Sequence, residues 1–160
     1  SKLSKLLFEK KANLIVSNIG RDPIDQLKHD KITFTESDIN SIFEQKCDII
    51  SPCALGGAIN SETKKKLKCK AIVGAANNQL DKSETAEWLR ENNIFYAPDY
   101  LVNSGGVIAI SCEINNSEDT LDDQLNKICD KVLSLLKESK KSSLSTDKIV
   151  EDLAWKRINI

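Results

Sequence analysis

One stretch of this sequence, residues 71–80, reads Ala71-Ile72-Val73-Gly74-Ala75-Ala76-Asn77-Asn78-Gln79-Leu80. Its apolar start predicts a short buried strand. Small residues directly after a strand let a ligand approach the backbone, and neighbouring amides can then fix the orientation of that ligand. An Asn-rich turn without a ligand fits the same residues equally well. The stretch therefore predicts a strand and leaves two alternatives for residues 74–80, a plain turn or a binding site.

Similar strand-like runs recur on both sides of this stretch. Short runs of apolar or β-branched residues occur at 12–19, 32–34, 47–50 and 94–97. Helix signals lie between or before them, namely an apolar stripe at Leu3, Leu6 and Leu7, a helix-opening Pro23, and possible helix caps at Ser37 and Asn60. Strands that alternate with helices at such spacings predict an α/β fold with a mostly parallel sheet and right-handed crossovers.

The predicted α/β fold also indicates where a ligand would bind. In open α/β sheets the usual site is the crevice outside the carboxyl ends of the strands. Asn18, residues 51–57 and residues 74–78 each come directly after a predicted strand or at its end. We therefore expect these three segments to converge and to favour a nucleotide or dinucleotide site.

The pattern changes after residue 97. Residues 98–106 form a turn-rich connection, and apolar residues then repeat every three or four positions from Leu121 to Leu136, which predicts a long amphipathic helix. A further helix is expected to begin near Ser145 or Thr146. We expect a single domain over residues 1–160, made of a partial dinucleotide-binding domain (about 1–110) and a C-terminal helical segment (about 111–160).

Composition excludes several classes of function. With 40% hydrophobic and 29% charged residues, the chain has the composition of an ordinary globular domain. A net charge of -1 and 5% aromatic residues argue against a nucleic-acid partner, and no apolar run is long enough for a membrane partner, so a cytoplasmic location is expected. Five cysteines without CxxC spacing and a single histidine, His29, predict neither a disulfide framework, a metal site nor a histidine-based triad.

Three blocks of this sequence carry a resemblance to a known family. They are Pro52-Cys53-Ala54-Leu55-Gly56-Gly57-Ala58-Ile59-Asn60, Gly74-Ala75-Ala76-Asn77-Asn78-Gln79-Leu80 and Tyr96-Ala97-Pro98-Asp99-Tyr100-Leu101-Val102-Asn103-Ser104-Gly105-Gly106-Val107. In this order and at these separations they resemble the nucleotide-binding domain of the glutamate/leucine/phenylalanine/valine dehydrogenases, and the first two look most like the leucine dehydrogenase branch. The resemblance implies a Rossmann-like, doubly wound sheet with C-terminal helices.

The same resemblance implies an activity. It is the NAD-dependent, reversible oxidative deamination of a branched-chain L-amino acid such as leucine to the 2-oxo acid and ammonia, with phenylalanine or valine as alternative substrates. A homo-oligomer is expected. Glutamate is the least expected substrate, because no local basic residue is marked out to bind a second carboxylate.

The resemblance also implies roles for individual residues. Those expected to contact the coenzyme are Asn18 and Ile19 at the adenosine ribose, Ala54 and Leu55 beside the dinucleotide, and Ala76 and Asn77 at the nicotinamide ribose. Asn78 and Asn103 are expected to bind the substrate. Plain alternatives exist: Gly56-Gly57 can simply be a loop with unusual backbone angles, and Asn103-Ser104 can be a helix cap before Val107.

Two departures from the family pattern limit these expectations. Asn18 stands where dinucleotide folds usually place an acidic residue, and Arg21 lies close by, so NAD is expected but NADP is not excluded. Residues 1–7 match the helix that comes after the family's glycine-rich turn. We therefore expect a sheet without its first strand, no catalytic residue within these 160 residues, and no turnover by this chain alone. A truncated non-catalytic module and a nucleotide-sensing module are the alternatives.

Overall fold

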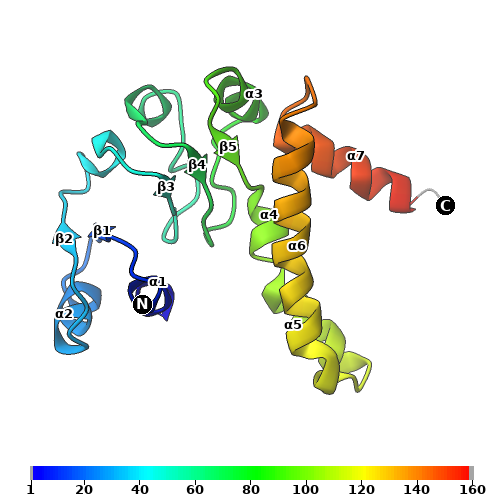
Figure 1. The fold of residues 1–160 in the computed structure, drawn as a ribbon, viewed down its shortest axis with the longest axis horizontal. Helices are drawn as coiled ribbons and strands as arrows, with labels where there is room; N and C mark the ends of the chain where they lie inside the picture. The colour runs from blue at the N-terminus through cyan, green and yellow to red at the C-terminus, as the bar shows by residue number, and fades with distance from the viewer. Residues whose placement is uncertain (1, 159–160) are drawn as a thin grey trace. The chain divides into compact units, whose positions relative to one another are not determined.

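The computed structural model describes residues 2–158 and shows a mixed α/β chain whose strands all pair in parallel (Figure 1). This confirms the predicted fold class. Contacts divide the chain into two compact units, with the boundary between Gln45 and Lys46. The single domain expected from the sequence stays a prediction.

The first unit contains two helices, two short strands and a 3₁₀ turn: α1 (Lys2–Glu9), β1 (Ile15–Val16), α2 (Asp22–His29), β2 (Thr35–Glu36) and η1 (Ile42–Glu44). β1 and β2 are parallel, with Ile15 opposite Thr35. Pro23 lies in the first turn of α2, as predicted, and His29 ends this helix with an exposed ring.

The second strand lies later than the sequence pattern predicted. Residues 32–34 were expected to form it, but β2 begins at Thr35. Ile32 instead closes α2, because its N–H donates to the Leu27 carbonyl at 3.0 Å while Lys31 adopts a positive φ of 56°. The apolar character of Ile32 therefore reflects its burial behind the helix end rather than a place in the sheet.

The second unit is built on a three-stranded parallel sheet in the order β3-β4-β5. It contains β3 (Ile49–Ile50), η2 (Thr63–Lys66), β4 (Ala71–Ile72), α3 (Ser83–Glu91) and β5 (Phe95–Tyr96). Ala71 pairs with Ile49 on one side and with Phe95 on the other, so β4 is the central strand. The core of the unit includes Ile59, Ile72 and Leu89, which are fully buried.

The predicted helix caps at Ser37 and Asn60 have different outcomes. Asn60 does cap a turn, because its Oδ1 accepts hydrogen bonds from the N–H groups of Glu62 and Thr63, both at 3.0 Å. The helix that follows this turn is only the short η2, whose own N-cap residue is Glu62. Ser37 does not cap the helix expected after it, since its hydroxyl bonds instead to the Asp38 carbonyl and to the Ser41 hydroxyl.

Helices complete the second unit: α4 (Asp99–Val102), α5 (Gly105–Ile114), η3 (Glu118–Thr120), α6 (Leu121–Ser139) and α7 (Thr146–Ile158). α6 runs beside α4 and α5, and α7 packs on α6, α3 and β5 (Figure 1). The two predicted C-terminal helices, α6 and α7, are confirmed. The sequence pattern missed α4, which is a single turn. It indicated α5 only through the alternative of a cap at Asn103-Ser104, because the apolar residues of α5 surround the helix without forming a stripe.

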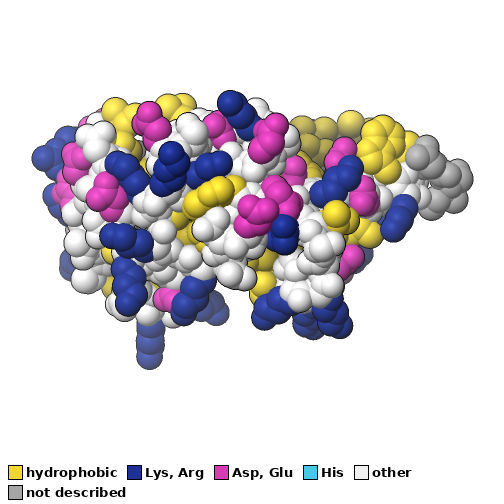
Figure 2. All heavy atoms as spheres, turned by 90° about the horizontal axis from the view of Figure 1, so that it is seen from above, with side chains coloured by type: hydrophobic (Ala, Val, Ile, Leu, Met, Phe, Trp, Pro, Cys, Tyr) yellow, Lys and Arg dark blue, Asp and Glu magenta, His cyan; other side chains and the backbone are white. Residues whose placement is uncertain are grey.

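Apolar side chains remain on the surface of α7. Leu153, Trp155 and Ile158 are all exposed, and Figure 2 shows hydrophobic side chains over this helix at the right of the view. Within residues 2–158 the longest and most apolar helices still fall short of what a membrane span requires.

Candidate functional site

The loops after β3 and β4 are joined by backbone hydrogen bonds at the carboxyl ends of these strands. Ala76 N–H donates to the Pro52 carbonyl at 3.0 Å, and Gly57 N–H donates to the Asn78 carbonyl at 2.7 Å. A third bond, from Ile59 N–H to the Gln79 carbonyl at 3.0 Å, extends the pairing. Residues 51–57 and 74–78, which were expected to converge, therefore do lie together.

Two glycines make this close approach possible. A Cβ on Gly74 would lie 2.2 Å from the Pro52 carbonyl oxygen, and one on Gly56 would lie 2.9 Å from the Asn77 carbonyl oxygen. Neither position has room for a side chain. Gly57 has a positive φ of 67°, so the alternative explanation of Gly56-Gly57, a loop with unusual backbone angles, applies to its second residue.

Gln79 holds the turn between Gly74 and Asn78 from the inside. Its side chain is fully buried, and its Nε2 donates to the carbonyls of Gly74 at 2.8 Å and Ala76 at 3.0 Å. Both amide hydrogens are thereby used. With Gln79 turned inward, Asn77 and Asn78 are left exposed at the surface.

The backbone of Asn78 is fixed in an uncommon conformation. Its φ is 51°, in the left-handed region that asparagine tolerates better than most residues. Its N–H donates to Asp99 Oδ2 at 2.7 Å, which connects the loop after β4 to the start of α4. The side-chain amide of Asn78 makes no hydrogen bond to another residue in the described part of the chain, so it is available to a ligand.

Asn103 lies against the side chain of Asn77. Its Nδ2 donates to Asn77 Oδ1 at 2.5 Å. Ser104 stands before α5 but donates its hydroxyl to the Leu101 carbonyl at 2.8 Å, and it makes no side-chain cap to that helix. Ser104 therefore stands at the N-cap position of α5, as the cap alternative had it, but caps the helix only through its backbone carbonyl, which accepts the Ile108 N–H at 3.0 Å. Asn77, Asn78 and Asn103 form one group, which we call the amide cluster.

The remaining candidate residues have different surroundings. Ala54 and Leu55 are exposed in the loop after β3, whereas the side chain of Ala76 is buried, which leaves only its backbone to line a site. Asn18 and Ile19 belong to the first unit, where Asn18 Nδ2 donates to the Gly20 carbonyl at 2.8 Å and Ile19 is 78% exposed.

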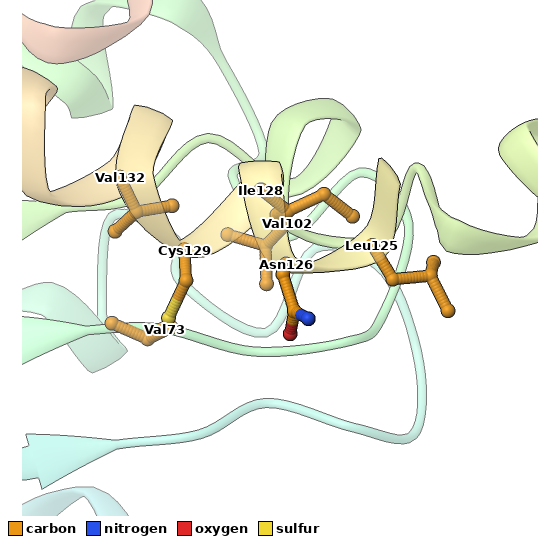
Figure 3. A pocket seen from close by; sticks show the side chains of 7 residues that line it. All are labelled: Val73, Val102, Leu125, Asn126, Ile128, Cys129 and Val132. Carbon is orange, nitrogen blue, oxygen red and sulfur yellow. The ribbon is translucent and has the colours of Figure 1, made fainter. Parts of the chain in front are cut away.

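Two apolar surfaces adjoin the amide cluster along the chain. The first is a hollow of about 350 Å³ between the end of β4, α4 and α6 (Figure 3), lined by Val73, Val102, Leu125, Asn126, Ile128, Cys129 and Val132. The second is the exposed face of α5, where Val107 is 72% and Ile110 58% exposed. Neither surface includes a basic side chain. Among residues 2–158 no three histidine, cysteine, aspartate or glutamate side chains are grouped so that they could hold a metal ion.

Comparison with known proteins shows which family the chain belongs to. Residues 5–153 match the model of the glutamate/leucine/phenylalanine/valine dehydrogenase family. The chain belongs to this family. The family match confirms the resemblance carried by the three sequence blocks. The matched residues include the amide cluster, α6 and most of α7.

Individual relatives are dehydrogenases of this family that act, by name, on apolar amino acids. The chain is 36% identical to leucine dehydrogenase and 35% identical to phenylalanine dehydrogenase, both from Thermoactinomyces intermedius, over 99% and 98% of its residues. It superimposes on the crystal structure of L-tryptophan dehydrogenase from Nostoc punctiforme with a TM-score of 0.92 at 33% identity, over 98% of this chain. The chain spans 43% of the length of the two curated relatives and 48% of that crystal structure.

Proposed function

We propose that this chain forms the coenzyme-binding part of an NAD-dependent amino acid dehydrogenase that deaminates a branched-chain L-amino acid such as leucine. Phenylalanine and valine are the alternative substrates. The observation that carries the proposal is the amide cluster, in which Asn78 and Asn103, from separate loops, are held together through Asn77 and Asp99 at the carboxyl ends of parallel strands. This is where open α/β sheets bind their ligands.

Within this proposal the amide cluster orients the substrate. The free side-chain amide of Asn78 can both donate and accept a hydrogen bond, so it can hold the carboxylate or the amino group of an amino acid without itself losing a proton. Asn103 would share this role. Asn77 and the Ala76 backbone would line the nicotinamide ribose. Bound NAD would supply the hydride acceptor for oxidation at the α-carbon.

The loops offer room for the coenzyme. A Cβ on Gly57 would meet no atom within 4 Å, and the neighbouring Ala54 and Leu55 are exposed, so a dinucleotide could approach this backbone. Asn18 and Ile19 would contact the adenosine ribose. Arg21, which could favour a 2′-phosphate, is paired with Glu36 at 2.8 Å, but both side chains are exposed and such pairs are weak, so the family resemblance rather than this pair favours NAD.

The apolar surfaces that adjoin the amide cluster along the chain support an apolar substrate. Val107 and Ile110 present aliphatic side chains on α5, which begins two residues after Asn103. A leucine side chain can bury against such a surface. Glutamate would bring a second carboxylate next to residues that offer it no positive partner, which is costly.

We place the groups that move protons outside these 160 residues and propose that the chain alone does not turn over substrate. We also propose a homo-oligomer, supported by the exposed apolar side chains of α7, which association with a second copy would bury. A non-catalytic or nucleotide-sensing module is the alternative function. An intact mass of the native protein near 17.8 kDa would favour that alternative, and a larger mass would favour the dehydrogenase.

The test is NAD reduction by the native protein that carries this chain, with leucine, phenylalanine, valine and glutamate as substrates. We expect the three apolar amino acids to be used and glutamate to be poor. Asn78→Ala should lower kcat/KM by about tenfold to a hundredfold, the usual range for losing an orienting hydrogen bond. Asn93→Ala is the matched control, because Asn93 is also exposed and has a φ of 58° but lies outside the amide cluster. Equal losses in both variants would overturn the assigned role of Asn78, and a preference for glutamate would overturn the substrate class.

A further inference from the structure

Asp99 connects the amide cluster to the rest of the second unit. Its carboxylate uses both oxygens: Oδ2 accepts the Asn78 N–H at 2.7 Å, and Oδ1 accepts the Tyr96 hydroxyl at 3.0 Å. The Tyr96 hydroxyl in turn accepts the Asp99 backbone N–H at 3.2 Å. The carboxylate is therefore held from two sides and cannot rotate away from Asn78 without breaking a hydrogen bond.

Tyr96 gives this arrangement a rigid base. Its side chain is 2% exposed at the end of β5, and burial raises the pKa of its phenol above the ordinary value, so the hydroxyl keeps its proton and remains a donor. Asp99 begins α4 and Asn103 comes directly after that helix. The short helix α4 thus holds both Asn77 and Asn78. Asp99 at its start accepts the Asn78 N–H, and Asn103 directly after it donates to Asn77.

The hydrogen bond from Asn78 has a conformational consequence. A non-glycine residue with a φ of 51° is strained relative to the right-handed region, so the left-handed form persists only where surrounding contacts stabilise it. The bond to Asp99 is charge-assisted, which makes it one of the stronger kinds of hydrogen bond. Removing the carboxylate would let Asn78 return to a commoner conformation and would change the direction of its side chain.

We propose that Asp99 is a positioning residue: with Tyr96 behind it, its carboxylate keeps Asn78 in the left-handed conformation and so sets the direction of the amide cluster toward the ligand. This inference rests on the proposed function, because the ligand is the one assigned to the amide cluster above. Asp99 touches neither substrate nor coenzyme in this scheme.

The experiment uses the ¹⁵N-labelled native protein that carries this chain and two readouts. They are the exchange rate of the Asn78 backbone amide with solvent and the chemical-shift changes that millimolar NADH with leucine, a pair that cannot react, causes at Asn77 and Asn78. Asp99→Ala should speed exchange at Asn78 by about tenfold to a hundredfold, as expected for a lost charge-assisted hydrogen bond, and should remove the ligand-induced shifts. Asp99→Asn keeps an oxygen acceptor for Asn78 but loses the charge and the acceptor of the Tyr96 hydroxyl, so both readouts should lie between those of Asp99→Ala and of the wild type.

Asp123→Ala is the matched control, because it removes an exposed aspartate from the first turn of α6 and should change neither readout. Tyr96→Phe provides a second variant if Asp99→Ala does not fold, and it should speed Asn78 exchange by a smaller factor. Unchanged exchange at Asn78 in Asp99→Ala, or in Tyr96→Phe when only that variant folds, would overturn the positioning role. Faster exchange in Asp99→Ala, together with a wild type that shows no ligand-induced shifts, would instead contradict the proposed function and leave the conformational role of Asp99 standing.

Discussion

Replacing Gly74 with alanine would put a methyl group into the backbone of Pro52. The new Cβ would lie 2.2 Å from the Pro52 carbonyl oxygen and 2.7 Å from both its nitrogen and its Cδ. All three atoms belong to the backbone or the proline ring, so no flexible side chain can move aside. Overpacked sites usually lose about 1–3 kcal/mol and lose more where the backbone must shift, so we expect Gly74→Ala to cost about 3 kcal/mol of unfolding free energy.

The same substitution elsewhere in the chain provides the controls. Gly106 lies in the first turn of α5 with nothing within 4 Å of an added Cβ, so Gly106→Ala should leave stability unchanged or raise it by up to about 1 kcal/mol. Gly56→Ala would meet the carbonyl oxygens of Asn77 at 2.9 Å and Asn78 at 3.0 Å, and it should cost about 1–2 kcal/mol.

Urea unfolding followed by far-UV circular dichroism measures these differences. With a slope of about 2 kcal/mol per molar urea, a loss of about 3 kcal/mol lowers the midpoint by about 1.5 M. The midpoint should be highest for Gly106→Ala, lower for Gly56→Ala and lowest for Gly74→Ala. Equal midpoints for Gly74→Ala and Gly106→Ala would refute the close joining of the loops after β3 and β4.

Three further predictions concern charge and titration. Glu36→Gln should free Arg21 and raise the ratio of NADP affinity to NAD affinity by about fivefold. Titration of this variant and of an exposed control variant, Glu118→Gln, with each coenzyme measures the ratio. The Thr85 hydroxyl holds the pKa of Asp81 below its ordinary 3.8, so Asp81→Asn should destabilise the chain at pH 6, and this difference should vanish as the pH falls through the lowered folded-state pKa. Burial raises the pKa of Cys69 to about 11, so at pH 8 iodoacetamide should modify it at least about tenfold more slowly than the exposed Cys129, as peptide mass spectrometry would show. Equal NADP-to-NAD affinity ratios for the two glutamate variants would contradict the first prediction. A stability difference that does not change with pH would contradict the second, and equal labelling rates of Cys69 and Cys129 would contradict the third.

Local sequence pattern predicted the elements whose signals lie within a few residues. The runs at 47–50, 71–73 and 94–97 each contain a strand, and the periodicity from Leu121 to Leu136 lies within α6. Such features depend on short-range propensity and on burial of one face. The pattern misplaced β2 because an apolar residue can be buried at a helix end as well as in a strand, as Ile32 is.

The candidate site depended on contacts between distant residues, and the sequence predicted it only in part. The blocks at 51–57 and 74–78 were expected to meet because both come after parallel strands. Asp99 and Gln79 received no role, because their hydrogen bonds to Asn78, Gly74 and Ala76 depend on the folded course of the loops rather than on a local pattern. An aspartate that opens a helix after a Pro would ordinarily be explained as a favourable helix-end charge.

Chemical-shift mapping can show whether the amide cluster is the ligand-binding edge of this dehydrogenase domain. The labelled native protein that carries this chain is titrated with NADH and then with leucine, a pair that cannot react. A binding role for the cluster predicts the largest changes at Asn77, Asn78 and Asn103. It predicts none at Asn93 or Asn116, which are exposed asparagines with φ values of 58° and 48° outside the cluster. Changes that appear equally at Asn93 and Asn116, or that spare Asn78 and Asn103, would contradict it.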